Sequence, residues 1–233
     1  MVRWAVGIVV FILGIVVSSG CLGTPNTSSS HCYSSSNITS STHVGSETPR
    51  EGEIILPKTI SFDAVLTITR DNVTLMKYSY SAIIDYPQMN AQVNFTSIYR
   101  PGMEGLTGNW HHKRIIIDNG SSVRIFIAPP AAWMPVLENR TKGIVDSVFY
   151  SNPYFVIFNS TSKHLNCSEC SVNVTLSPEA SALLLAQFVG INNVPHIPLE
   201  GIIVVEDSVI ISAKFTGVFE DRMYNFSLEV KDI

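Results

Sequence analysis

The feature that most restricts the fold of this chain is a series of segments in which apolar and polar residues alternate. In residues 59–69 an apolar residue stands at every second position from Phe62 to Ile68, with Asp63 and Thr67 among the residues between them. Successive side chains of a β-strand point to opposite faces, so this pattern predicts a strand with one buried face. Similar patterns predict four more strands, at 76–86, 89–99, 109–117 and 123–128.

Short turn sequences separate these five predicted strands. Asp71-Asn72, Pro101-Gly102 and Asp118-Asn119-Gly120-Ser121 combine residues that favour turn conformations. The third of these segments is typical of a β-hairpin. Strands joined by such short turns pair with their neighbours in opposite directions, so the first half of the folded region is predicted to be an antiparallel meander.

The alternation stops at residues 128–135, which are apolar but contain Pro129, Pro130 and Pro135. Proline lacks a backbone donor, so this segment is not expected to form a central strand or a long helix. The next segment, 144–158, is rich in aromatic residues and is predicted to cover one mouth or face of a curved sheet.

A helix is predicted from Pro178 to about Val189. Ser177 is a favoured N-cap residue, proline suits the first helical position, and Gly190 ends the helix. The helix is apolar nearly all round, which predicts burial on more than one side. Strands predicted at 171–176, 201–205, 209–216 and 223–230 add a second meander, so the fold class is mainly β with a few helices.

The N-terminus has the pattern of an export signal. Arg3 precedes an uncharged apolar run at 5–17, which is shorter than the roughly 20 residues that span a bilayer. Ser18-Ser19-Gly20 and Cys21 follow, and this junction resembles the lipobox of prokaryotic lipoproteins, although Ser18 stands where the common pattern has leucine. The resemblance implies a signal peptide at 1–20, a lipidated Cys21 and a chain anchored at the cell membrane on its extracytoplasmic side. An uncleaved signal anchor and a plain cleaved signal are the alternatives.

Residues 21–50 are predicted to be a flexible tether, because they are dominated by serine and threonine and contain few apolar residues. A coil of this length would span about 30 Å. The folded domain is then 51–233. Cys32 lies in the tether and is interpreted as an inert residue, a dimer link or a second lipid site, in that order.

Composition and motifs argue against several classes of function. The net charge is −4 with 15% charged residues, so no basic field exists to attract nucleic acid. His111 and His112 are adjacent on a predicted strand and point to opposite faces, so they cannot bind one metal ion together. No catalytic or nucleotide-binding motif is present, and we expect neither enzymatic activity nor a cofactor.

Cys167 and Cys170 form the one Cys-x-x-Cys motif of the chain, which excludes a four-cysteine zinc site. In an oxidising compartment these cysteines are predicted to form a structural disulfide. A redox-active pair is the alternative, but such pairs usually stand at a helix N-terminus after a strand, whereas this pair precedes one.

Ten of the fifteen asparagines begin an Asn-x-Ser/Thr sequon, where chance would give about three. Strand alternation creates some of them by placing asparagine and threonine on one polar face. The excess nevertheless predicts surface N-glycosylation, and within the folded domain the candidates are Asn72, Asn94, Asn119, Asn139, Asn159, Asn166, Asn173 and Asn225.

The order of elements over residues 58–231 resembles the LolA/LolB-like superfamily: antiparallel strands, the Asp118-Asn119-Gly120 hairpin, a helical insertion and a closing strand group. The resemblance implies a curved sheet, or half-barrel, packed on helices and holding acyl chains of a lipid or lipoprotein between the two. The implied sheet residues are Tyr78, Tyr80, Ile84, Val93 and Phe95, and the implied lid residues are Trp133, Met134, Leu184 and Phe188. The same residues would form the core of any half-buried sheet.

Three hypotheses about function follow. The first is an anchored binding module for an apolar, lipid-like ligand. The second is a structural or sensory glycosylated surface lipoprotein with a packed core and a protein or cell-envelope partner. The third is a thiol-disulfide redox protein that uses Cys167 and Cys170. A continuous apolar cavity between sheet and helix would favour the first, whereas a filled core would argue against it.

Overall fold

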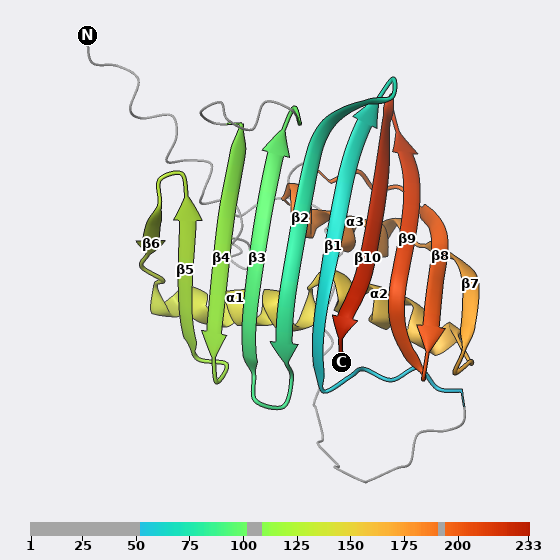
Figure 1. Cartoon of the computed structure of the whole chain (residues 1–233), viewed down its shortest axis with the longest axis horizontal. Coiled ribbons are helices and arrows are strands. Elements are labelled where there is room, and N and C mark those ends of the chain that lie inside the picture. Colours follow the sequence, from blue (N-terminus) through green and yellow to red (C-terminus); the bar gives the residue numbers. More distant parts are fainter. Residues whose placement is uncertain (1–51, 102–108, 191–193) are drawn as a thin grey trace, which may run out of the picture.

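The computed structural model describes residues 52–101, 109–190 and 194–233. These residues form a ten-stranded antiparallel sheet with three α-helices against one face (Figure 1). The predicted signal peptide, the tether, Cys21 and Cys32 lie outside the described residues. Within them, no helix is long and apolar enough to cross a membrane.

The strands follow the order β6-β5-β4-β3-β2-β1-β10-β9-β8-β7 across the sheet. The first meander comprises β1 (Thr59–Arg70), β2 (Val73–Asp85), β3 (Asn90–Tyr99), β4 (Trp110–Asp118), β5 (Ser122–Ala128) and β6 (Ala132–Met134). The second comprises β7 (Cys170–Leu176), β8 (Leu199–Glu206), β9 (Val209–Phe219) and β10 (Arg222–Asp232). Pairing of β1 with β10 joins the two meanders into one sheet, so the predicted mainly β, antiparallel fold class is confirmed.

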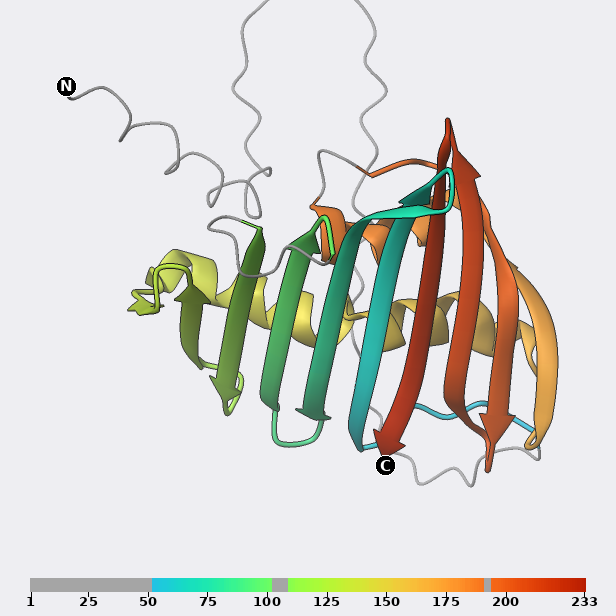
Figure 2. The same cartoon turned by 45° about the horizontal axis from the view of Figure 1, so that its top comes forward.

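The sheet curves around a layer made of α1 (Glu138–Tyr150), α2 (Pro153–Thr161) and α3 (Pro178–Val189), with a 3₁₀ turn at Ser162–His164 (Figure 2). In both views α1 and α2 follow one another across the strands. We call the sheet face toward these helices the inner face and the opposite face the outer face.

Turn chemistry explains why the strands reverse where the sequence predicts. Asp71 and Asn72 both have positive φ between β1 and β2, and Asn119 and Gly120 do so between β4 and β5. Two successive residues with positive φ match the right-handed twist of the flanking strands, and Asn, Asp and Gly tolerate that conformation best.

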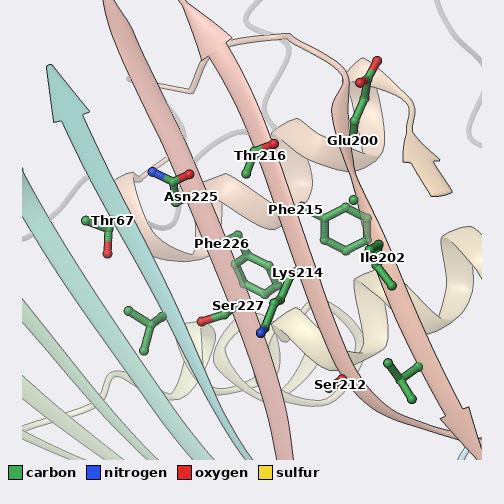
Figure 3. A pocket seen from close by; sticks show the side chains of 13 residues that line it. Thr67, Glu200, Ile202, Ser212, Lys214, Phe215, Thr216, Asn225, Phe226 and Ser227 are labelled. Atoms are coloured by element: carbon green, nitrogen blue, oxygen red, sulfur yellow. The ribbon is translucent and has the colours of Figure 1, made fainter. Parts of the chain in front are cut away.

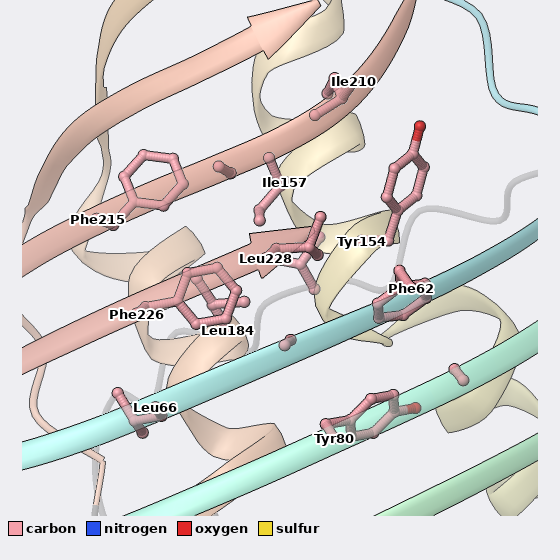
Figure 4. Close-up of a cluster of buried hydrophobic side chains, with 14 of the residues drawn as sticks. Phe62, Leu66, Tyr80, Tyr154, Ile157, Leu184, Ile210, Phe215, Phe226 and Leu228 are labelled. Carbon is pink, nitrogen blue, oxygen red and sulfur yellow. The ribbon is translucent and has the colours of Figure 1, made fainter. Parts of the chain in front are cut away.

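The core lies between the centre of the sheet and the helices (Figure 4). Phe62 and Leu66 of β1, Tyr154 of α2 and Leu184 of α3 are almost completely removed from solvent. Each such side chain stabilises the fold by about 1.5–3 kcal/mol relative to an exposed one.

Local signals also set the helix ends. The Ser177 hydroxyl accepts a hydrogen bond from the Ala180 N–H at 3.2 Å, Pro178 opens α3, and Gly190 with φ +79° ends it, all as predicted. In the aromatic segment, the Asn152 side chain accepts from the Phe155 N–H at 2.9 Å and starts α2.

The structure adds detail to two expectations from the sequence and contradicts neither. The proline-containing segment 128–135 includes the short strand β6, which is possible because β6 is an edge strand and pairs with β5 alone. The segment 144–158, predicted only as a cover, falls within two helices that begin at Glu138 and Pro153.

Candidate functional site

The end of the sheet formed by β3 to β6 carries apolar residues on its inner face. Register places Phe95 of β3, Lys113 of β4 and Ile127 of β5 side by side, and Val93, Ile115 and Ile125 form the next row. Met134 of β6 continues that row beside Ile125. We call the part-exposed apolar residues of this end the inner apolar surface; they are Phe95, Ile115, Val123, Ile125, Ile127 and Met134.

The helices cover the inner face unevenly. On β4, Ile117 is 1% exposed, Ile115 and Lys113 are half-buried, and His111 is exposed. Met134 at the edge is 40% exposed. By contrast, the inner side chains of β1, β9 and β10 at the sheet centre are buried. The inner apolar surface is therefore a continuation of the core that the helices cover only in part.

Lys113 is a cation within this apolar surface. Its register partners Phe95 and Ile127 are both apolar, and burial lowers the pKa of its amine. No ion pair within the described parts of the chain includes Lys113. A charge removed from water without a partner is unfavourable, which marks the position as a candidate site.

Beyond Lys113, toward the start of β4, the inner face carries polar side chains. Ser97 lies opposite His111 on the inner face and is buried, and the His111 ring packs edge-on against Tyr99 with centroids 6.0 Å apart. The inner face of this end is thus apolar near β6 and α1 and becomes polar toward Tyr99 and His111. An amphipathic ligand requires that combination.

Most of the ligand-binding residues implied by the resemblance lie in the packed core. Tyr78, Tyr80, Ile84, Val93, Leu184 and Phe188 are all buried. The Phe188 ring contacts Tyr78, Tyr80 and Phe95 at centroid distances of 6.2 to 6.5 Å, and burial raises the pKa of both tyrosines. In this part of the molecule, side chains fill the space between sheet and helix.

The implied lid residues Trp133 and Met134 lie on opposite faces of the sheet. Met134 faces inward beside Ile125, but Trp133 lies on the outer face, is 55% exposed and packs against Phe126 with ring centroids 5.5 Å apart. Because β6 is a strand, neighbouring residues point to opposite faces. Trp133 therefore does not line the inner face, which corrects its place in the predicted lid.

Sequence reasoning missed Lys113, Ile115, Ile125 and Ile127 as site residues. A signal was available, because Lys113 occupies the same parity in β4 as the inward-facing Ile115 and Ile117. A lysine in an otherwise apolar row is unusual for a core strand.

A hollow lies on the outer face over β1, β10, β9 and β8 (Figure 3). It has a volume of about 620 Å³, and its lining includes Thr67, Ile202, Lys214, Thr216 and Asn225. Its hydroxyl and amide groups point away from the helices, so it is separate from the inner apolar surface.

The remaining predicted positions are placed as follows. Cys167 and Cys170 form the predicted disulfide, which links the segment before β7 to the first residue of that strand, and both are half-buried against the core. His111 and His112 point to opposite faces, as expected. Within the described ranges, no cluster of three or more His, Cys, Asp or Glu side chains could hold a metal ion.

All eight sequon asparagines of the folded domain are exposed or half-exposed. Asn72 and Asn119 stand in hairpin turns, and Asn94, Asn173 and Asn225 lie on strands with their sequon partners on the same face. Their exposure is compatible with modification, and glycosylation stays a prediction.

No family model matches the chain, and no curated protein matches it. Among solved structures, it is similar to the crystal structure of a LolA superfamily protein from Nitrosomonas europaea, with a TM-score of 0.24 and 9% sequence identity. The match covers 78% of this chain and 88% of that protein. A TM-score this low carries no argument about function, so the site is interpreted from its own residues.

Proposed function

We propose that this chain is a membrane-anchored extracytoplasmic lipoprotein that binds an apolar, lipid-like ligand on the inner apolar surface. The observation that carries the proposal is the uneven cover of the inner face, which leaves apolar residues of β3 to β6 part-exposed beside a fully packed centre. Contiguous apolar residues that stay part-exposed on a concave face are typical of ligand sites.

The proposed ligand position is narrower than the one implied by family resemblance. The Tyr80 ring already contacts both Phe62 and Phe188 across the centre, so an acyl chain would displace core side chains there. Next to Ile115, Ile125 and Met134 it would cover surface that is now part-exposed. The ligand is therefore placed against β4 to β6.

The N-terminal sequence supports the proposed location. A lipid on Cys21 and a tether of about 30 residues would hold the domain near a bilayer, which is a source of amphipathic molecules. Stable anchoring requires more than one acyl chain, as a lipidated lipobox cysteine would provide.

The experiment is a binding assay on the chain from residue 22 onward, exported with a generic cleavable signal. Displacement of the neutral fluorescent probe N-phenyl-1-naphthylamine by dodecanol would report occupancy. Ile127→Asn should weaken dodecanol binding about fivefold or more, because it places an unpaired amide on the inner apolar surface. Ile83→Asn is the matched control, since Ile83 is 53% exposed on the outer face. Equal affinities of the two variants would contradict the proposal.

The alternative function is a structural or sensory surface lipoprotein that meets a protein or cell-envelope partner. The filled core and the hollow over β8 to β10 favour it. If the wild-type chain fails to bind dodecanol and carries no co-purified lipid after solvent extraction, this alternative replaces the first proposal.

The proposed function involves no enzymatic activity, no cofactor and no nucleic-acid partner. The thiol-disulfide hypothesis is the weakest of the three, because Cys167 and Cys170 stand at the start of strand β7 rather than at a helix N-terminus.

A further inference from the structure

Lys113 has surroundings that are unusual for a lysine. Its neighbours across the ladder are Phe95 and Ile127, and the next inward-facing residue along β4 is Ile115. A lysine on a surface strand normally directs its amine into water. Here the side chain starts from the inner face and lies in the half-buried zone between the core and the exposed His111.

The inner face offers no carboxylate to this amine. The inward-facing residues of β3, β4 and β5 are apolar, aromatic, hydroxyl-bearing or basic, and none is Asp or Glu. Asp118 is the one acidic residue on these three strands, and it pairs with Arg124 at 3.1 Å. The described part of the chain thus places a cation on an apolar surface without its counter-charge.

An unpaired, partly desolvated ammonium is stabilised strongly when an anion reaches it, because charge-assisted hydrogen bonds are stronger than neutral ones. The groups that would surround such an anion include further donors. Ser97, Tyr99 and His111 lie in the adjacent rows on the same face.

We propose that Lys113 binds the anionic head group of the ligand, so that the preferred ligand is an amphiphile ending in a carboxylate or a phosphate. This inference rests on the proposed function, since it assumes that the apolar part of the same molecule covers the inner apolar surface. The head group lies toward Tyr99 and His111, and the chain runs along Ile115 and Ile125 toward Met134.

The test compares three ligands with the same chain length: dodecanoate, dodecyl phosphate and dodecanol. They are measured by displacement of N-phenyl-1-naphthylamine from the chain from residue 22 onward. We expect at least one anionic ligand to bind about tenfold tighter than dodecanol. The comparison of dodecanoate with dodecyl phosphate shows whether a carboxylate or a phosphate is the natural head group.

Three variants assign the preference to the side chain. Lys113→Met keeps most of the length of the side chain without the charge, and it should bind all three ligands with affinities within about twofold of one another. Lys113→Arg should retain the preference for anions. Lys77→Met is the control, because Lys77 is exposed on the outer face of β2, and it should behave as the wild type. Thermal melts establish that each variant is folded.

Each result supports or overturns either the inference or the proposed function. Anion preference that is lost in Lys113→Met and kept in the other two variants supports the inference. Equal binding of dodecanol and both anions by the wild type, or unchanged preference in Lys113→Met, overturns the inference and leaves the proposed function standing. Absence of binding by all three ligands overturns the proposed function itself.

Discussion

Substitution of Phe188 distinguishes two interpretations of the aromatic residues between sheet and helices, namely a packed core and the lining of a ligand cavity. It is 5% exposed on α3, and its ring contacts residues of three strands: Tyr78, Tyr80, Phe95 and Phe226. If these rings form the core, removing the central ring leaves a cavity. If they line a ligand cavity, removing it costs affinity but little stability.

The structure favours the core, and it sets the magnitude for Phe188→Ala. Truncating a buried phenylalanine to alanine destabilises by about 3–5 kcal/mol, and the cost lies toward the upper end where surrounding groups cannot collapse. Four surrounding rings on a hydrogen-bonded sheet have little freedom to collapse. We therefore expect about 4 kcal/mol.

The assay is urea unfolding at pH 7, followed by tryptophan fluorescence. With a slope of about 2 kcal/mol per molar urea, the midpoint should fall by about 2 M. Leu183→Ala is the matched control on the same helix, since Leu183 is 57% exposed, and its effect should stay within about 0.5 kcal/mol. A loss of less than 1 kcal/mol for Phe188→Ala, with weakened dodecanol binding, would refute the assignment of these rings to the core.

Two further predictions concern the backbone and the pH range. Gly201→Ala should destabilise by more than 2 kcal/mol in the same urea assay, because a Cβ there would overlap the Lys214 carbonyl across the ladder; a neutral effect would show that β8 and β9 can separate locally. Burial raises the pKa of Tyr86 to about 12, whereas the unfolded phenol ionises near pH 10. The unfolded state therefore loses its proton first, and stability present below about pH 10 is lost as the pH rises toward 12. Tyr86→Phe should reduce this alkaline loss by up to about 2 kcal/mol in melts recorded from pH 9 to 12, and an unchanged slope would contradict the assignment.

Local patterns predicted the strands well, because strand alternation and turn chemistry are encoded over a few residues. The row from Phe62 to Ile68 faces the core as expected, and Ser177 and Gly190 mark the ends of α3. What the sequence did not indicate is non-local. Pairing of β1 with β10 joins residues about 160 positions apart, and its free energy depends on the assembled sheet rather than on either segment alone.

The candidate site was less accessible to sequence reasoning for a related reason. The inward parity of Lys113 can be read from Ile115 and Ile117, but whether that position is covered depends on where the helices lie. Helix α1 buries only Val145, Val148 and Phe149, spaced at i, i+3 and i+4, within a segment that is otherwise mostly polar. Three buried positions are too few for the sequence pattern to distinguish a helix from an irregular segment. The sequence therefore predicted only a mixed aromatic cover.

The dimensions of the two layers explain why the sheet has a filled centre and an open end. Ten strands at about 4.8 Å spacing make a sheet about 43 Å wide. Helices of 13 and 9 residues, laid one after the other across the strands, cover about 33 Å of that width. A strand of nine residues is about 30 Å long, whereas one helix covers about 10 Å of it.

At the centre of the sheet α3 adds a second helix beside α2, and aromatic rings fill the space that is left. Over β4 to β6, α1 crosses behind the strands at one level along their length (Figures 1 and 2). One helix cannot cover strands of that length, so Ile115, Ile125 and Ile127 stay part-exposed. The same geometry leaves Lys113 at the boundary between the helix-covered and the open part of β4, where an anionic group could reach its amine without crossing the core.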